Sequence, residues 1–138
     1  MSYLNIITLF NEPRENDKNS LYSVYLNRQL LCDSIREIFE TDFPETLTGK
    51  NVLLKPNWVK HTKRQDDWVC LTTNKNFILS VLELMLKSHP ASVKIGDAPI
   101  QGCRWEELIT EDFIAEIKSL SQIYKVPVEI IDFRRSIF

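Results

Sequence analysis

The chain has few glycines, and none of them belongs to a phosphate-binding motif. Its 138 residues include three: Gly49, Gly96 and Gly102. No P-loop and no GxGxxG pattern follows any predicted strand, so the glycines that let backbone N–H groups approach a phosphate are missing. Standard NAD binding and Walker-type nucleotide hydrolysis are therefore disfavoured. Each glycine instead indicates a turn or a strand end.

Cysteine is equally scarce, and its spacing gives no metal site. Cys32, Cys70 and Cys103 are odd in number and far apart, and no CxxC pair occurs. A zinc ribbon or an iron–sulfur site needs such pairs, so we predict no metal, and the sequence identifies no cofactor. Isolated cysteines are typical of reduced thiols, which predicts a cytoplasmic protein without a disulfide framework.

The chain also lacks a surplus of positive charge and a long apolar run. It carries 17 Lys and Arg against 19 Asp and Glu. Proteins that bind a phosphate backbone use excess positive charge, so nucleic acid is not an expected partner. The first residues, MSYLNIITLF, show no basic segment before a long apolar one, and no run approaches the roughly 20 residues that span a bilayer. We therefore predict neither export nor membrane insertion.

What the sequence does contain is an alternation of short apolar runs and amphipathic segments. Apolar residues at spacings of three and four predict helices, and short runs rich in Val, Ile and Leu between turn residues predict buried strands. Pro56 ends one strand because it cannot donate a ladder hydrogen bond, and Pro127 follows the end of a helix. The predicted strands are Tyr3–Phe10, Asn51–Lys55, Ser92–Ile95 and Val128–Asp132, and the predicted helices are Leu26–Phe39, a segment from Thr72 or Thr73 to His89, and a segment marked by Phe113, Ile117, Leu120 and Tyr124.

This order predicts an α/β fold with the arrangement β-α-β-α-β-α-β. We expect a three-layer structure with a mostly parallel four-stranded sheet and three main helices. Crossovers of this length within one sheet are right-handed and join parallel strands. No internal repeat or second boundary is visible, and 138 residues is the usual size of one domain, so residues 1–138 are expected to form a single α/β domain.

Polar residues follow the predicted strands at what should be one edge of the sheet. In open α/β sheets, ligands bind outside the carboxyl ends of the strands, where loops and helix amino termini meet. We therefore predict a ligand site there, with Lys55 and Asp97 as the candidate catalytic residues. The candidate ligand-binding residues are Asn57, Thr72, Thr73, Asn74 and Gln101.

Each of these residues has a second interpretation. A helix that begins with TTN offers free N–H groups and hydroxyls that suit a phosphate or carboxylate, but Thr72 or Thr73 can equally be a simple helix cap. Asp97 can act as a general base, accept ligand hydroxyls, bind a metal, or bond backbone N–H groups that hold its turn. Lys55 as a catalytic amine requires burial, so a plain anion-binding charge is the favoured role.

Nucleophilic chemistry is also conceivable, although no motif pairs the residues. Cys70 and Cys103 are candidate nucleophiles, and His61 and His89 are candidate bases, yet a structural role is favoured for them. The segment from Trp58 to Leu71 has no periodicity and is predicted to be a long loop. Tryptophans flank these loops, where they wall a pocket or pack in the core: Trp58, Trp68 and Trp105.

Four segments together resemble a known family. VLLKPNWV, CLTTNKNFILSVLELMLK, SVKIGDAPIQGC and VPVEIIDFRR are similar, in order and distance, to domain of unknown function family 362. The KPN, TTN and GDAPIQG motifs carry this resemblance, which covers most of the chain. Each motif alone is weak, and the combination is what makes the resemblance specific.

The resemblance implies an α/β domain whose reaction is not assigned. Some members carry a ferredoxin-like module with iron–sulfur clusters, which these residues do not contain. Members similar to the GDAPIQG version are associated with cell-surface polysaccharide biosynthesis, which implies a sugar-related or carboxylate-bearing ligand. The family domain is about twice as long. The chain is therefore expected to match its amino-terminal part, and a homo-oligomer or a missing carboxyl-terminal half is expected to complete it.

Two functional hypotheses follow. The first is an enzyme, or half of one, that acts on a small anionic or sugar-related metabolite. The second is a non-catalytic ligand-binding or assembly module in a cell-surface polysaccharide pathway. A scaffold whose motifs only hold turns is a third alternative, because resemblance at the level of a fold does not specify a reaction.

Overall fold

The structure is a computed structural model that describes residues 25–42, 47–64 and 67–135. The predicted first strand, Tyr3–Phe10, lies outside the described residues. In chain order the elements are α2 (Arg28–Asp42), β1 (Asn51–Leu54), α3 (Trp68–Leu71), α4 (Lys75–Lys87), β2 (Ser92–Asp97), α5 (Trp105–Leu108), α6 (Glu111–Tyr124) and β3 (Val128–Asp132).

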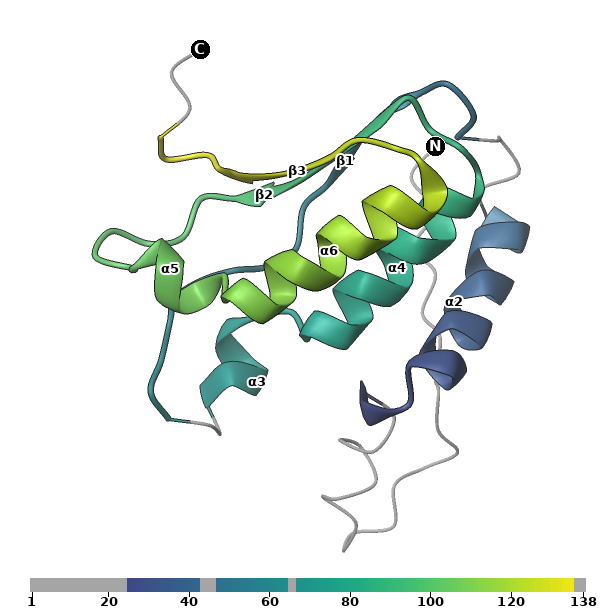
Figure 1. Cartoon of the computed structure of the whole chain (residues 1–138). Helices are drawn as coiled ribbons and strands as arrows, with labels where there is room; N and C mark the ends of the chain where they lie inside the picture. The colour runs from purple at the N-terminus through teal and green to yellow at the C-terminus, as the bar shows by residue number, and fades with distance from the viewer. Residues whose placement is uncertain (1–24, 43–46, 65–66, 136–138) are drawn as a thin grey trace, which may run out of the picture.

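The sheet has three strands, all parallel, in the order β1-β2-β3 (Figure 1). Val52 aligns with Val93 in the neighbouring strand, and Val93 aligns with Val128. Helix α4 connects β1 to β2, and α6 connects β2 to β3. The predicted α/β class, with parallel strands and three main helices, is confirmed. The described sheet has three strands where the sequence predicts four, and the predicted first strand falls outside the described residues.

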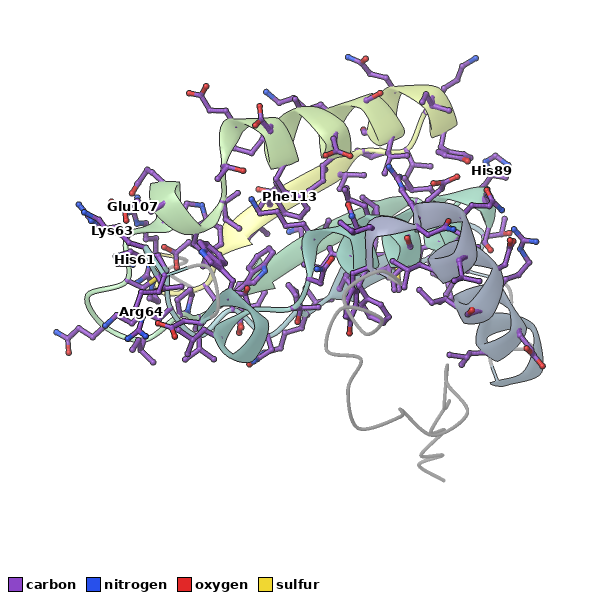
Figure 2. The ribbon with its side chains drawn as sticks, turned by 90° about the horizontal axis from the view of Figure 1, so that it is seen from below. His61, Lys63, Arg64, His89, Glu107 and Phe113 are labelled. Carbon is purple, nitrogen blue, oxygen red and sulfur yellow. The ribbon has the colours of Figure 1, made fainter. Side chains whose placement is uncertain are left out.

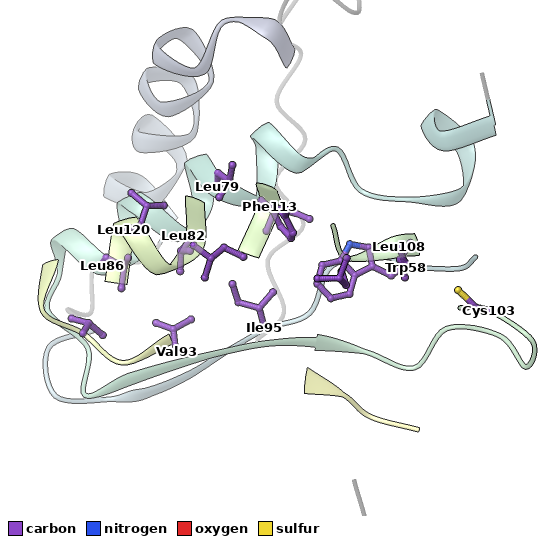
Figure 3. Packing of buried hydrophobic residues seen from close by; sticks show 14 residues of the cluster. Trp58, Leu79, Leu82, Leu86, Val93, Ile95, Cys103, Leu108, Phe113 and Leu120 are labelled. Atoms are coloured by element: carbon purple, nitrogen blue, oxygen red, sulfur yellow. The ribbon is translucent and has the colours of Figure 1, made fainter. Parts of the chain in front are cut away.

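Both crossover helices cover the same face of the sheet (Figures 1 and 3). Side chains alternate along a strand, so Val93 and Ile95 pack against the helices, whereas Lys94 points away and is exposed. Successive right-handed crossovers that step the same way across a sheet place their helices on one face. The described residues therefore form two layers. A third layer requires a reversal of the strand order, which the described strands do not contain.

The main core lies between the sheet and the helices α4 and α6. Burial of one large aliphatic or aromatic side chain contributes roughly 1.5–3 kcal/mol, so this cluster is the main contact that holds the two layers together. Figure 3 shows its packing. Its members from the two helices, each 2% exposed or less, include Leu79, Leu82, Leu86, Phe113 and Ile117.

Helix α2 packs on the outer side of α4 and forms a smaller second cluster. Leu31 and Ile35 of α2 pack against Val81 and Leu84 of α4. These residues recur at the three- and four-residue spacing that predicts an amphipathic helix between Leu26 and Phe39. The observed helix, Arg28–Asp42, confirms that prediction.

The boundaries of the remaining elements follow from local hydrogen bonding. Strand β3 has the predicted bounds, and β1 ends at Leu54, shortly before Pro56. Strand β2 continues past the predicted end to Asp97, because Asp97 still pairs with Asp132 of β3. The predicted loop after β1 contains the four-residue helix α3. In the described part of the chain, no helix is long and apolar enough to cross a membrane.

Candidate functional site

A buried carboxylate joins the segments that follow β1 and β2. Asp97 is the last residue of β2 and is 6% exposed. Its Oδ1 lies 2.8 Å from Nζ of Lys55 and accepts the N–H of Ala98 at 2.9 Å. Its Oδ2 accepts the backbone N–H of Trp58 at 2.7 Å. Lys55 and Asp97, which the sequence predicts to be neighbours, are therefore in contact at the carboxyl edge of the sheet.

These donors set the charge state of Asp97. Burial acts in the opposite direction and raises its pKa, because a charged carboxylate loses its hydration. The hydrogen bonds from Lys55 and from the N–H groups of Trp58 and Ala98 outweigh burial, so the pKa of Asp97 lies below its ordinary value. A carboxylate with these partners is a weak proton acceptor at neutral pH. The arrangement suits a group that holds loops in place.

Lys55 is anchored by Asp97 but remains open to solvent. Its side chain is 59% exposed, while one oxygen of Asp97 holds its ammonium group. A catalytic amine has to be buried enough to lose its charge. Lys55 is exposed, and its partner Asp97 is a charged carboxylate. The ammonium group is held in place by Asp97, and its other side is open to solvent. This arrangement suits contact with an anion.

Asn57 and Thr73 form a second link at the same edge. The Thr73 hydroxyl accepts the N–H of Asn57 at 2.8 Å, and the N–H of Thr73 donates to the carbonyl of Asn57, also at 2.8 Å. Next to this pair, Trp58 and Thr72 form an antiparallel bridge. The segment that leaves β1 is therefore fastened to the segment that enters α4.

The cap of α4 differs from the prediction. Asn74 is the N-cap residue, and its side chain accepts the N–H of Asn76 at 2.9 Å. The Thr72 hydroxyl donates to the carbonyl of Trp68 at 2.9 Å, and Thr73 binds Asn57, so neither threonine caps α4. The prediction was wrong because several adjacent residues had cap-forming side chains, and only the backbone conformation selects among them. Polar groups left for a ligand are the exposed Asn74 and the remaining N–H groups of the first turn.

Gln101 lies in the turn that follows β2. The turn is tied to the loop after β1, because the N–H of Ile100 donates to the carbonyl of Val59 at 3.0 Å. Gln101 itself is exposed, and its side chain makes no hydrogen bond to a described residue. Gly102 follows with φ of +82°, a conformation that favours glycine. The predicted site therefore has a compact part around Lys55 and Asp97, and Gln101 belongs to a neighbouring turn.

A second polar cluster, which the sequence does not predict, occupies the same loops. Nδ1 of His61 accepts the backbone N–H of Arg104 at 3.0 Å, and its Nε2 lies 3.4 Å from a carboxylate oxygen of Glu107. Because Nδ1 accepts, the proton of a neutral His61 ring is on Nε2. Figure 2 shows His61 and Glu107 at one end of the molecule and His89 at the other. The two histidines therefore belong to different surfaces.

Cys103 belongs to the His61 cluster, but the geometry does not make it a nucleophile that His61 activates. Its Sγ accepts the backbone N–H of His61 at 3.2 Å, and the residue is 6% exposed. Both ring nitrogens of His61 bind other partners, Arg104 and Glu107. A structural role, which the sequence favours, is consistent with these contacts. The side chain of Cys70 lies outside the described residues.

The carboxyl end of β3 contributes an ion pair to these loops. Arg134 donates three hydrogen bonds to the carboxylate of Asp132, from Nε at 2.8 Å, from Nη2 at 2.7 Å and from its backbone N–H at 3.1 Å. It also donates to the carbonyl of Cys103 at 2.9 Å. The side-chain bonds from Arg134 lower the pKa of Asp132 and outweigh the effect of its burial, and the same pair raises the pKa of Arg134. The Asp132–Arg134 ion pair thereby connects the end of β3 to the loop that follows β2.

The tryptophans pack in the core beneath these loops. Trp58 is 3% exposed, and its ring meets Trp105 edge-on with centroids 5.6 Å apart. It also meets Phe113 of α6 edge-on at 6.4 Å. Such pairs stabilise beyond the effect of burial alone, by roughly 0.5–1.5 kcal/mol. Of the two predicted roles for Trp58, core packing is the one observed.

A groove of about 430 Å³ lies elsewhere, between the helices α2, α4 and α6. Its charged side chains pair with one another: Arg28 binds Glu83 at 3.0 Å and lies 3.5 Å from Glu116, and Lys87 lies 3.3 Å from Glu83. No set of unpaired charges converges on this groove among its described lining residues. It therefore gives no support for a second charged-ligand site.

Within residues 25–42, 47–64 and 67–135, no three His, Cys, Asp or Glu residues are grouped so that they could hold a metal ion. Comparison of the chain with protein-family models, with curated proteins and with solved structures finds no match in any of the three.

Proposed function

We propose that the chain binds a small anionic ligand, a phosphate or a carboxylate, at the carboxyl edge of its sheet. The observation that carries this proposal is the contact between Lys55 and Asp97. The buried carboxylate holds the lysine at 2.8 Å, while 59% of the lysine side chain remains exposed. The amine is therefore oriented before a ligand arrives, which reduces the entropy that binding has to overcome.

The start of α4 supports the same conclusion. The first N–H groups of a helix carry a partial positive charge that attracts anions. The two hydrogen bonds between Asn57 and Thr73 hold this helix start against the segment that carries Lys55. Asn57 and Asn74 are exposed there, and their amides can donate to a carboxylate or bond the hydroxyls of a sugar.

The proposal of a sugar-related metabolite as the ligand class rests on the resemblance of the KPN, TTN and GDAPIQG motifs to domain of unknown function family 362 alone. For an enzyme, or half of one, Lys55 and Asp97 are the proposed catalytic residues. The non-catalytic alternative, a ligand-binding or assembly module in a cell-surface polysaccharide pathway, is favoured by one observation. Both oxygens of Asp97 already accept hydrogen bonds, which disfavours proton transfer by this group.

Isothermal titration calorimetry with inorganic phosphate, glucose 1-phosphate and glucuronate tests the proposal. We expect binding in the millimolar range or tighter. Lys55→Ala should weaken it about tenfold or more, because a hydrogen bond to a charged group contributes roughly 1.5–3 kcal/mol. Lys118→Ala, which removes an exposed lysine of α6, is the matched control and should leave binding unchanged.

Thr73→Val is the second variant, because it removes the hydroxyl that accepts the N–H of Asn57 while keeping the shape of the side chain. We expect weaker binding of the same ligand. The proposal fails if none of the three compounds binds at millimolar concentration, or if Lys55→Ala and Thr73→Val both bind like the parent protein. Turnover of a bound sugar phosphate, followed by phosphorus NMR, separates the enzyme from the binding module.

A further inference from the structure

His61 joins two segments of the chain through a hydrogen bond that exists only while its ring is neutral. Its Nδ1 accepts the backbone N–H of Arg104 at 3.0 Å, and its Nε2 lies 3.4 Å from a carboxylate oxygen of Glu107. An imidazole nitrogen accepts a hydrogen bond only when it carries no proton, and the protonated ring carries one on each nitrogen. Protonation of His61 therefore removes the acceptor on which the Arg104 contact depends.

The donor in this contact cannot reverse its role. A hydroxyl group can turn from donor to acceptor when its partner gains a proton, but a backbone N–H group only donates. Arg104 is the N-cap residue of α5, so its backbone is also part of the start of that helix. After protonation, two N–H groups face each other across the 3.0 Å that now separate Nδ1 from the Arg104 nitrogen, and they have to move apart.

Charged groups around His61 act on the two states of its ring in opposite directions. The carboxylate of Glu107, which belongs to α5, favours the protonated ring. The guanidinium of Arg104 forms a salt bridge with the same carboxylate and weakens this effect. Lys63 and Arg64 of the same loop lie at this end of the molecule and also favour the neutral ring (Figure 2).

Two further hydrogen bonds connect the same segments without using the ring. The N–H of Ile100 donates to the carbonyl of Val59 at 3.0 Å, and Sγ of Cys103 accepts the backbone N–H of His61 at 3.2 Å. Protonation of the imidazole leaves the donors and acceptors of both bonds unchanged. Among these three connections, the contact between His61 and Arg104 is therefore the one that depends on the charge of the ring.

We propose that His61 is a pH-dependent latch between the loop after β1 and the segment that enters α5. In neutral solution the unprotonated ring holds the N–H of Arg104. Histidine is the side chain whose ordinary charge change falls between about pH 5 and 8, so the latch opens in mildly acidic solution. The ring then gains a proton on Nδ1, loses the Arg104 contact and retains Glu107 as its ion-pair partner. This inference does not depend on anion binding at Lys55, and the two are tested separately.

NMR of the uniformly ¹⁵N-labelled protein, titrated from about pH 8 to about pH 5, tests the latch. At the start we expect the ring of His61 to show the tautomer with its proton on Nε2. As the ring gains a proton, the amide proton of Arg104 should move upfield with the same midpoint, because it loses its acceptor. Its protection against hydrogen exchange, relative to the intrinsic rate at each pH, should fall several-fold, as expected for one lost hydrogen bond.

The chain contains its own control for this titration. His89 lies at the opposite end of the molecule, so the Arg104 amide should not follow the midpoint of His89 (Figure 2). Asp97 and Asp132 have pKa values below the ordinary 3.8, so their titration falls below this pH range. An Arg104 amide signal that stays constant while His61 titrates overturns the proposal, and so does a neutral His61 ring with its proton on Nδ1.

Three variants complete the test. His61→Asn places an amide oxygen near the position of Nδ1 and has no ionisable group, so the Arg104 amide signal should become independent of pH in this range. Glu107→Gln removes a charge that favours the protonated ring, so the Arg104 midpoint should move to lower pH. His89→Asn is the matched control and should leave the Arg104 titration unchanged. An Arg104 signal that still titrates in His61→Asn contradicts the latch.

Discussion

The carboxylate of Asp97 accepts the backbone N–H of Trp58 at 2.7 Å, across a sequence separation of 39 residues. Both residues are buried, at 6% and 3% exposure. The bond holds the segment after β1 against the end of β2, and Lys55 joins it from the surface. Asp97 therefore contributes both to the site and to the stability of this edge.

Asp97→Ala should lower the free energy of unfolding by about 1–3 kcal/mol, because a buried N–H group that loses its only acceptor retains the cost of its desolvation. Asp97→Asn should cost less, since its carbonyl oxygen can still accept one of the N–H groups. Urea denaturation followed by far-UV circular dichroism measures both. Equal stability of Asp97→Ala and the parent would show that the Trp58 contact contributes nothing measurable.

The dependence of protein stability on pH should reflect the lowered pKa values of Asp97 and Asp132. The pKa of each carboxyl lies below the ordinary value of 3.8. Hydrogen bonds from Lys55 and from backbone N–H groups lower it for Asp97, and hydrogen bonds from Arg134 lower it for Asp132. A carboxylate whose pKa is lower in the folded state stabilises the fold above its unfolded pKa, and this contribution is lost as the pH falls through the folded value.

We therefore expect the urea midpoint to fall between about pH 5 and about pH 2. The fall should be shallower in Asp97→Asn, because that variant has one titrating group fewer. Glu129→Gln, at an exposed position of β3, is the matched control and should follow the parent. A profile for Asp97→Asn that runs parallel to the parent would contradict the assigned pKa shift.

Gly96 should tolerate no side chain. A Cβ atom there would lie 2.6 Å from the carbonyl oxygen of Ile131 and 2.7 Å from the ring of Phe133. Overpacking of this kind typically costs about 1–3 kcal/mol, so Gly96→Ala should be clearly destabilised in a urea titration. Phe133→Ala should not restore the variant, because the backbone oxygen of Ile131 remains. Gly49→Ala is the comparison variant. A Cβ atom there meets no atom within 4 Å, so its only cost is the backbone strain of alanine at a φ of +71°.

The contact between Lys55 and Asp97 could be predicted because it depends on a general property of the fold. Parallel strands end at the same edge, so a residue that follows β1 meets one that ends β2. The identity of the α4 cap was not predictable, because Thr72, Thr73 and Asn74 all have suitable side chains. Their assignment depends on how the loop after β1 turns back to pair with Thr73.

The polar cluster of His61, Glu107 and Arg104 was beyond prediction for a related reason. His61 comes from the loop after β1, whereas Arg104 and Glu107 are the N-cap residue and a residue of the short helix α5. Tertiary contacts bring the two segments together, and no periodicity relates them. Within the cluster, Arg104 and Glu107 are three residues apart and form a salt bridge, which is the only local signal in the sequence. Helix α3 was missed because four residues are too few to show a helical period.

The last prediction concerns the face of the sheet that no described helix covers. Leu53 is 59% exposed on this face, and Ile131 and Phe133 lie on the same side as Gly96. The sequence predicts an interface at the last strand or the last helix, with Ile130, Ile131, Phe133 or Phe138 in contact. Ile130 instead faces the helices and packs against the core, and Phe138 lies outside the described residues. The apolar surface expected at an interface is therefore formed by Leu53, Ile131 and Phe133.

We expect association into a dimer or a larger oligomer through this face, because apolar surface beside a strand edge that no described strand pairs with promotes pairing with another chain. Sedimentation velocity across about a hundredfold range of concentration should show a shift towards larger species, as mass action requires. Leu53→Glu should move the equilibrium towards the monomer without lowering the melting temperature of the monomer, since its side chain is mostly exposed. Ile123→Glu, at a 66% exposed position of α6, tests the competing interface on that helix. A parent protein that sediments as a monomer throughout the range would remove the basis for a sheet-mediated oligomer.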